Sequence, residues 1–167
     1  CLNKPSNDIL SGTGFDVHAF EDAGVMWLGG VEIDSELSFK AHSDGDVAIH
    51  SLIDALLGAA GMGDIGMMFP DNDDTYKGID SKELLKTVVT KLNNFGFIIV
   101  NIDLTIAAEK PRLGKYKMAI RKTLANILKI DASRVNIKAT TTEKLGFIGR
   151  AEGVGVLANA NLKYYDW

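Results

Sequence analysis

The sequence has a single cysteine, Cys1, so it offers neither a disulfide framework nor a thiolate-rich structural zinc site. No apolar run approaches the roughly 18 residues of a membrane-spanning helix, and the opening residues lack the apolar segment of a signal peptide. Basic residues are also too few for a polyanion-binding surface, since 18 lysines and arginines stand against 22 aspartates and glutamates, for a net charge of −4. We therefore expect no nucleic-acid or membrane partner, and an anionic substrate would be bound locally by metal ions or backbone amides.

The 167 residues fit a single domain, and 46% hydrophobic with 24% charged residues is typical of a globular chain with a packed core. We interpret the polar opening, residues 1–12, as a lead-in or linker and residues 13–167 as the domain. The first residue is not methionine, which leaves open a processed form or a piece of a longer fused protein.

Periodicity and turn residues predict an α+β fold. Residues 13–20 and 25–33 are predicted to be strands that a short turn joins into a hairpin. Helical patterns follow the capping residues Ser43 and Asp80, and residues 61–77 between them are predicted to be a functional loop. The remaining predicted elements are strand 97–108, a helix near residues 116–127, and strands 135–141 and 154–162. This order predicts a mixed or antiparallel sheet with helices packed on one face.

Asp16 and His18 are two residues apart on a predicted strand, so their side chains leave the same face of the sheet. His50, on the first predicted helix, can join them. Three nitrogen and oxygen ligands with a fourth position open are typical of catalytic zinc sites. Asp54, one helical turn after His50, can orient that imidazole or simply face solvent. The alternative is that both histidines are ordinary half-buried residues.

Two further clusters suit anionic ligands. His42 and Ser43 lie where a helix begins, and unsatisfied amides there favour phosphate, although simple capping explains part of this pattern. Residues 138–144 bring consecutive threonine hydroxyls and Glu143 to a strand end, where they can hold phosphate oxygens and a hard cation such as Mg²⁺. The alternative is an ordinary strand end followed by a helix start.

These motifs together resemble one enzyme family, the 2-C-methyl-D-erythritol 2,4-cyclodiphosphate synthases of the non-mevalonate isoprenoid pathway. The resemblance covers the chain from about Gly14 to its C-terminus. The segments that carry it, in the family's order and spacing, are Gly14–His18, Ala41–Asp46, Asp54–Ala60, Gly63–Gly66, Phe69–Asp71 and Lys138–Gly146.

The resemblance implies a homotrimer with a chorismate-mutase-like architecture and active sites between neighbouring subunits. It implies the substrate 4-diphosphocytidyl-2-C-methyl-D-erythritol 2-phosphate, a cytidine diphosphate derivative. Its 2-phosphate attacks the β-phosphorus, CMP leaves and a cyclic diphosphate forms. It also implies the cytoplasm of a bacterium or a plastid-type organelle, and the C-terminal half of fused cytidylyltransferase–cyclase enzymes is a related possibility.

The resemblance further implies the site residues. Zn²⁺ would be bound by Asp16, His18 and His50, and Mg²⁺ or Mn²⁺ by Glu143. The catalytic residues would be Asp64, Thr141 and Glu143. The residues implied for the phosphates and the methylerythritol are His42, Ser43, Asp64, Ile65, Gly66, Phe69, Asp71 and Thr141. Those implied for the cytidine are Ala108, Pro111, Arg112, Ala139, Thr140 and Thr141. Phe147 and Arg150 match positions that line a central cavity for an isoprenoid diphosphate, or are a core aromatic beside a surface arginine.

Metal ions suit this reaction because two phosphate groups of like charge must approach each other, and an acidic chain lacks the cations to neutralise them. Two other functions remain open at this point. One is a zinc hydrolase of a nucleotide-linked phosphate. The other is a trimeric isoprenoid-diphosphate-binding protein without catalysis.

Overall fold

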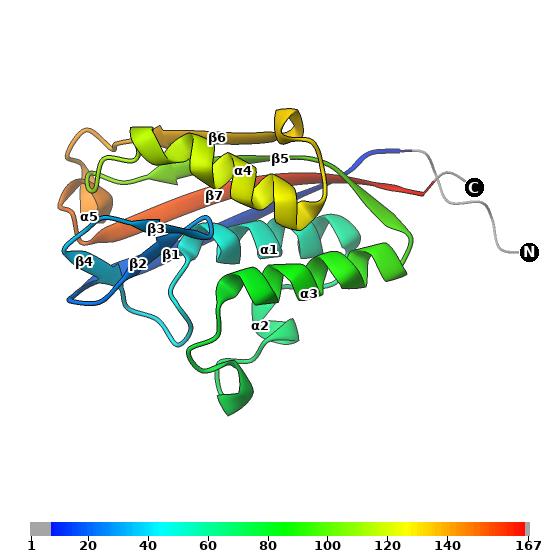
Figure 1. Cartoon of the computed structure of the whole chain (residues 1–167), viewed down its shortest axis with the longest axis horizontal. Coiled ribbons are helices and arrows are strands. Elements are labelled where there is room, and N and C mark those ends of the chain that lie inside the picture. The colour runs from blue at the N-terminus through cyan, green and yellow to red at the C-terminus, as the bar shows by residue number, and fades with distance from the viewer. Residues whose placement is uncertain (1–7, 166–167) are drawn as a thin grey trace, which may run out of the picture.

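A five-stranded sheet with the strand order β4-β1-β7-β5-β6 forms the centre of the structure, a computed structural model that describes residues 8–165 (Figure 1). β5 and β6 are parallel and the other neighbours are antiparallel, which confirms the predicted mixed sheet and α+β class. A small second sheet pairs β2 with β3. The strands are β1 (Leu10–Asp22), β2 (Met26–Leu28), β3 (Val31–Ile33), β4 (Leu37–Phe39), β5 (Phe97–Ala107), β6 (Val135–Thr140) and β7 (Gly153–Tyr164).

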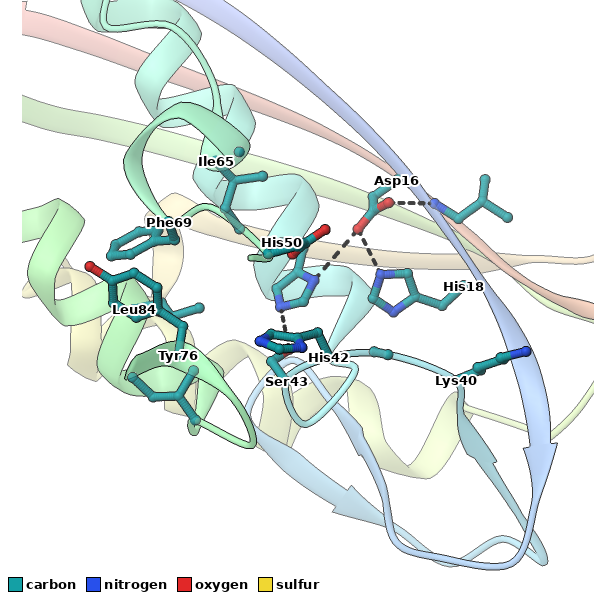
Figure 2. Close-up of a pocket in the computed structure, with 15 residues that line it drawn as sticks. Asp16, His18, Lys40, His42, Ser43, His50, Ile65, Phe69, Tyr76 and Leu84 are labelled. Carbon is teal, nitrogen blue, oxygen red and sulfur yellow. Dashed lines mark hydrogen bonds and ion pairs between the residues drawn. The ribbon is translucent and has the colours of Figure 1, made fainter. Parts of the chain in front are cut away.

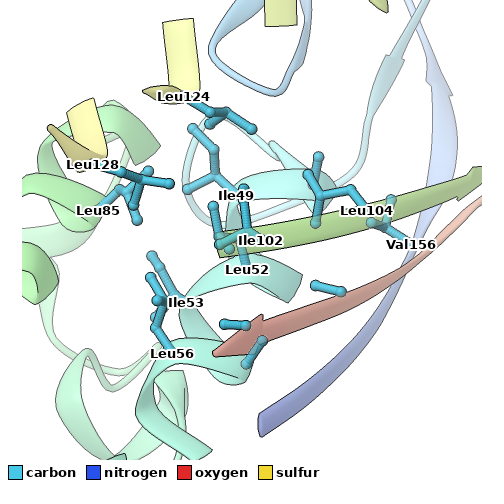
Figure 3. Close-up of a cluster of buried hydrophobic side chains, with 14 of the residues drawn as sticks. Ile49, Leu52, Ile53, Leu56, Leu85, Ile102, Leu104, Leu124, Leu128 and Val156 are labelled. Atoms are coloured by element: carbon cyan, nitrogen blue, oxygen red, sulfur yellow. The ribbon is translucent and has the colours of Figure 1, made fainter. Parts of the chain in front are cut away.

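The longer helices lie on one face of this sheet (Figure 1). α1 packs on β1 and β7, α4 packs on β6, and α3 packs against both helices. Leucine, isoleucine and valine side chains from these helices meet those of β5 and β7 in the core (Figure 3). The helices are α1 (Val47–Ala60), α2 (Ile65–Met68), α3 (Ser81–Asn94), α4 (Lys117–Leu128) and α5 (Gly146–Gly149), with 3₁₀ turns at Asp74–Tyr76, Gly114–Tyr116 and Ala132–Arg134.

Two glycines of β1 let α1 lie directly on the strand backbone. A Cβ atom on Gly14 would come within 1.9 Å of the Ser51 carbonyl oxygen, and one on Gly12 within 2.1 Å of the Ala55 oxygen. No real Cβ tolerates such contacts, so glycine is required at both positions. The close approach sets the depth of α1 over β1, and His50 therefore lies beside Asp16.

The opposite face of the sheet is open along most of its length. Phe15 of β1 and Leu157 of β7 are register partners on this face and are 64% and 49% exposed. Of the described helices, only α5 approaches it, through Ile148, which lies near Gly155. Phe15 and Leu157 therefore form an exposed apolar pair on this face.

The predicted hairpin of residues 13–20 and 25–33 is wrong. β1 pairs with β7 and, at its end, with β4, whereas β2 and β3 form a hairpin of their own. The Phe20 and Phe39 rings stack 5.9 Å apart, and the Ser38 hydroxyl donates to the Ala23 carbonyl at 2.7 Å. These contacts place β4 beside β1. The sequence does not predict β4, because its three residues are too few to show the alternation typical of a strand.

Helix α1 begins later than predicted. Ser43 is not its N-cap, because the backbone turns at Gly45 with a φ of +78° and the Asp46 carboxylate caps the Ile49 amide. The predicted loop 61–77 contains α2 and a 3₁₀ turn. Strand β1 begins at Leu10, inside the segment that was interpreted as a lead-in. Local patterns place the centres of elements better than their ends.

Candidate metal and substrate site

Asp16, His18 and His50 meet at one point, as the sequence predicts (Figure 2). Oδ2 of Asp16 lies 3.0 Å from Nε2 of His18 and 3.7 Å from Nδ1 of His50. All three potential ligand atoms lie within 4.8 Å of one another. β1 supplies two of the side chains from one face and α1 supplies the third, so two packed elements hold the cluster.

The cluster favours a cation. Burial alone raises the pKa of Asp16, but the hydrogen bonds and charges of His18 and His50 outweigh it and hold the pKa well below its usual range. Burial likewise lowers the pKa of His18, yet Asp16 raises it above its usual value overall. Nδ1 of His18 lies 2.8 Å from the Gly45 carbonyl oxygen, which only accepts, so Nδ1 carries a proton there. The neutral ring then directs its Nε2 lone pair at a carboxylate oxygen, and this pairing needs a proton or a metal ion between the two atoms.

The cluster lies in a cleft of about 400 Å³. Ser43 Oγ reaches His50 Nε2 at 3.1 Å, and Nε2 of His42 is buried without a hydrogen-bond partner among the described residues. An unpaired buried nitrogen is costly unless a ligand satisfies it. The residues predicted for phosphate and methylerythritol that line this cleft are His42, Ser43, Ile65, Gly66, Phe69 and Asp71. Lys40, Tyr76, Ile79 and Leu84 also line it and were missed, because no local motif marks them.

Asp64 and Asp54 hold the wall of the cleft together. Asp64 does not line it; its carboxylate caps α2 by accepting from the Met67 amide at 2.9 Å. Asp54 accepts from the Ile65 amide at 2.7 Å and makes no hydrogen bond to His50, so it fastens α2 to α1 rather than orienting the imidazole. Burial raises the pKa of Asp54 despite that amide.

The residues predicted for cytidine form a second cleft of about 570 Å³. Glu109 supports one of its walls, because its Oε1 accepts from the Thr142 and Lys144 amides at 3.1 Å each. Glu143 lies between them with a φ of +53°. The predicted residues that line this cleft are Ala108, Pro111, Arg112, Ala139, Thr140 and Thr141.

The two clefts are separate within one chain. Asp16 pairs with Val156, which pairs with Ile106, which pairs with Ala139, so one row crosses the sheet from β1 to β6. Three strand spacings put the ends of this row roughly 14 Å apart. The chain therefore brings the Asp16 cluster together with His42 and Ser43, but not with Thr141 and Glu143.

Phe147 and Arg150 lie at α5, outside both clefts. Phe147 is 41% exposed, and the Arg150 guanidinium forms an ion pair of 3.2 Å with Glu152. Phe147 is thus not a core aromatic residue; it lies on α5, the helix that contacts β7 and approaches Gly155 through Ile148.

Residues 9–163 match the YgbB family. The chain belongs to this family. This YgbB-family chain is 78% identical over all its 167 residues to the bifunctional enzyme IspD/IspF of Sulfurimonas denitrificans, of which it covers 43%. It thus spans less than half the length of that relative.

Solved structures agree with this assignment. The bifunctional IspDF from Campylobacter jejuni superposes with a TM-score of 0.94 at 52% identity, over 98% of this chain and 44% of that one. A 2C-methyl-D-erythritol-2,4-cyclodiphosphate synthase with bound CDP gives 0.84 at 32% identity, over 92% of this chain and 99% of that one. The resemblance drawn from the motifs is confirmed. Among the described residues of the YgbB-family chain, no helix is long and apolar enough to cross a membrane.

Proposed function

We propose that the chain cyclises 4-diphosphocytidyl-2-C-methyl-D-erythritol 2-phosphate to 2-C-methyl-D-erythritol 2,4-cyclodiphosphate and releases CMP. The observation that carries the proposal is the convergence of Asp16, His18 and His50 in a cleft beside His42 and Ser43. A cyclodiphosphate synthase of the same fold binds CDP. A nucleotide-sized second cleft with threonine hydroxyls on this chain fits the same ligand.

The Asp16 cluster fits Zn²⁺. It offers one carboxylate oxygen and two imidazole nitrogens, and three such ligands leave a position open for substrate. Zn²⁺ there supplies a Lewis acid for a phosphoryl oxygen. Glu143 would hold Mg²⁺ or Mn²⁺, which prefer oxygen ligands and phosphate.

The other residues bind and orient the substrate. His42 and Ser43 would hold a phosphate, because the buried Nε2 of His42 has no hydrogen-bond partner within residues 8–165. Asp64 would accept the methylerythritol hydroxyls beside Ile65 and Gly66, which line the cleft, while Thr140 and Thr141 would face the nucleotide. A folded substrate brings its 2-phosphate near the β-phosphorus, which removes an entropic barrier of up to roughly 7 to 11 kcal/mol.

The proposed assembly is a homotrimer. Within one chain the metal cluster lies at β1 and the Glu143 segment follows β6, three strands away across the sheet, so a complete site needs a neighbouring copy. The open face supports such packing, because Phe15 and Leu157 are exposed side by side there. Phe147 and Arg150, at α5, would bind an isoprenoid diphosphate through the exposed ring and the guanidinium.

The direct test is product analysis. The purified chain, supplied with Zn²⁺ and Mg²⁺, is incubated with the substrate, and products are identified by phosphorus NMR and mass spectrometry. Cyclic diphosphate with an equal amount of CMP supports the proposal. Linear phosphate products would identify a hydrolase, and binding without turnover would identify a binding protein.

A further inference from the structure

The ring nitrogen of His50 that points away from Asp16 lies in a polar pocket between α1 and α3. Its Nε2 is 2.9 Å from Oγ of Ser81, the first residue of α3, and 3.1 Å from Oγ of Ser43. Ser81 is fully buried, and its hydroxyl donates a short hydrogen bond to Oδ1 of Asp44. The Ser81 amide donates to the other oxygen of Asp44 at 2.9 Å.

The nearer of these two contacts, to Ser81, indicates which nitrogen of the imidazole carries the proton. A serine hydroxyl has one proton, and a carboxylate only accepts, so the Ser81 proton lies on the side of Asp44. The contact between Ser81 Oγ and His50 Nε2 is then a hydrogen bond only if Nε2 carries the proton. In a neutral imidazole this leaves Nδ1 without a proton, with its lone pair directed at the Asp16 cluster.

In His18 a single contact indicates which ring nitrogen carries the proton. Its Nδ1 donates to a backbone carbonyl, that of Gly45, so Nε2 is the free nitrogen. A carbonyl oxygen can only accept a hydrogen bond, whereas a serine hydroxyl can rotate and donate one to the imidazole instead. The tautomer of His50 therefore depends on an acceptor that takes the Ser81 proton, and Asp44 is that acceptor.

We propose that Ser81 and Asp44 are positioning residues that hold His50 as the Nε2–H tautomer, so that Nδ1 is free to bind a metal ion. The inference rests on the proposed metal site at Asp16, His18 and His50. Neither residue touches the cluster's ligand atoms. Without Ser81 the ring keeps only the longer contact to Ser43, whose hydroxyl can donate to Nε2, and without the Asp44 carboxylate the Ser81 hydroxyl can donate to Nε2. Either change favours a proton on Nδ1, the nitrogen that faces Asp16.

The chain provides a matched control for a lost buried hydroxyl. Ser51, on α1 next to His50, is also fully buried, and its hydroxyl donates to the Val156 carbonyl at 2.9 Å. Ser51→Ala therefore removes a hydrogen bond of the same kind at the same depth, one residue from the metal cluster, without changing a contact of the imidazole.

The test measures Zn²⁺ affinity directly, by competition with a chromophoric chelator, for the wild type and for Ser81→Ala, Asp44→Ala and Ser51→Ala. Loss of a group that orients a metal-binding histidine typically weakens metal affinity about 10- to 100-fold. We expect this loss in Ser81→Ala and Asp44→Ala, and wild-type affinity in Ser51→Ala. Asp44→Ala keeps the serine and removes both acceptor oxygens, so it provides the test if Ser81→Ala does not fold.

A second readout is the tautomer itself. Long-range proton–nitrogen correlation spectra of the metal-free wild type, with the imidazole neutral, should show a proton on Nε2 of His50 and none on Nδ1. Equal Zn²⁺ affinity in all four proteins, or a proton on Nδ1 of the metal-free wild type, would overturn the inference while leaving the metal site intact. A wild type that binds no Zn²⁺ would instead overturn the metal site of the proposed function, and this inference with it.

Discussion

Nε2 of His18 lies 3.0 Å from Oδ2 of Asp16, two residues earlier on the same strand. The other ring nitrogen, Nδ1, lies 2.8 Å from the Gly45 carbonyl oxygen, so Nε2 is the nitrogen that is free to contact the Asp16 carboxylate. An imidazole lone pair and a carboxylate oxygen at this distance need a shared proton or a metal ion. The same contact therefore serves as an ion pair in the metal-free chain and as two ligands in the metal-bound one.

Asp16→Ala should abolish zinc binding. The carboxylate supplies the only negative charge among the three proposed ligands, and two imidazoles alone bind a divalent cation more weakly. We expect about one zinc per chain in the wild type and close to none in the variant, measured by elemental analysis after dialysis. Asp103→Ala is the control, because it removes an exposed carboxylate, paired with Lys138, on β5 of the same sheet. Equal zinc in wild type and Asp16→Ala would refute the ligand assignment.

The metal-free chain should be most stable in mildly acidic solution. The lowered pKa of Asp16 contributes stability that is present above its ordinary value of 3.8 and is lost as the pH falls through the folded pKa. The raised pKa of His18 contributes stability that is present below its ordinary value of 6.5 and is lost as the pH rises through the folded pKa. Both contributions are complete between these two ordinary values.

Thermal melts with a chelator should therefore show an advantage of the wild type over Asp16→Asn that peaks between about pH 4 and pH 6.5. Zinc should reverse the trend, since the metal requires deprotonated imidazoles, and its stabilising effect should grow as the pH rises toward 8. A wild-type advantage that is the same at all pH values would contradict the assignment of these shifts to the Asp16–His18 pair.

Asp46→Ala should destabilise the fold strongly. The carboxylate is fully buried and accepts from the amides of Gly29, Gly30 and Ile49 at 2.8, 2.7 and 3.0 Å. The change leaves three buried donors without a partner, at a cost of about 3 kcal/mol or more in the free energy of unfolding. Urea denaturation measures this loss. Asp73→Ala, which removes an exposed cap from a 3₁₀ turn, is the control and should cost well under half as much.

The sequence predicts the metal cluster because each of its parts is a local pattern. Period-two alternation puts Asp16 and His18 on one face of a strand, and α1 is apolar enough around its circumference to be buried beside that strand. Such patterns do not predict the depth of the helix over the strand, that is, how closely α1 approaches the β1 backbone. The small size of Gly12 and Gly14 sets that depth, and their role becomes visible only once the partner element is known.

Contacts between residues far apart in the sequence cannot be predicted from local patterns. Ser81 meets His50 across 31 residues, and Glu109 supports the Thr142–Lys144 backbone across 33. No spacing rule connects residues so far apart in the sequence, so neither of these two contacts was predicted. The separation of the two clefts was likewise invisible, because it depends on the strand order β1-β7-β5-β6. Motifs identify candidate site residues, but the strand order decides which of them one chain brings together.

Glu109 should tolerate glutamine but not alanine. Its Oε1 accepts from two backbone amides that flank Glu143, and an amide oxygen in Glu109→Gln accepts in the same way. Glu109→Ala leaves both amides unpaired and frees a backbone held at positive φ. We expect CMP release to fall about 10-fold in the alanine variant, with a higher Mg²⁺ or Mn²⁺ requirement, and to stay near wild type in the glutamine variant. A glutamine variant as impaired as alanine would show that the charge, and not the hydrogen bonds, is needed.

A shared active site makes a mixing experiment decisive. If the metal cluster of one copy works with the Glu143 segment of its neighbour, His50→Ala and Glu143→Gln each inactivate every site of their own trimers. In trimers that contain both variants, some sites combine the intact metal cluster of one copy with the intact Glu143 segment of the other. Each trimer that contains both variants, in either ratio, should have one working site out of three, so the isolated mixed trimers should recover about a third of the wild-type activity.

The two variants, carrying different affinity tags, are co-expressed, and mixed trimers are isolated through both tags before CMP release is measured. The control is a mixture of His50→Ala with Asp16→Ala, whose changes fall in the same cluster, so no arrangement of copies rebuilds a site and activity should stay absent. Recovery in the first mixture but not in the second requires that the two clefts, roughly 14 Å apart across one sheet, are joined between copies. Inactive mixed trimers in both cases would place the whole reaction within a single chain and would refute the shared site.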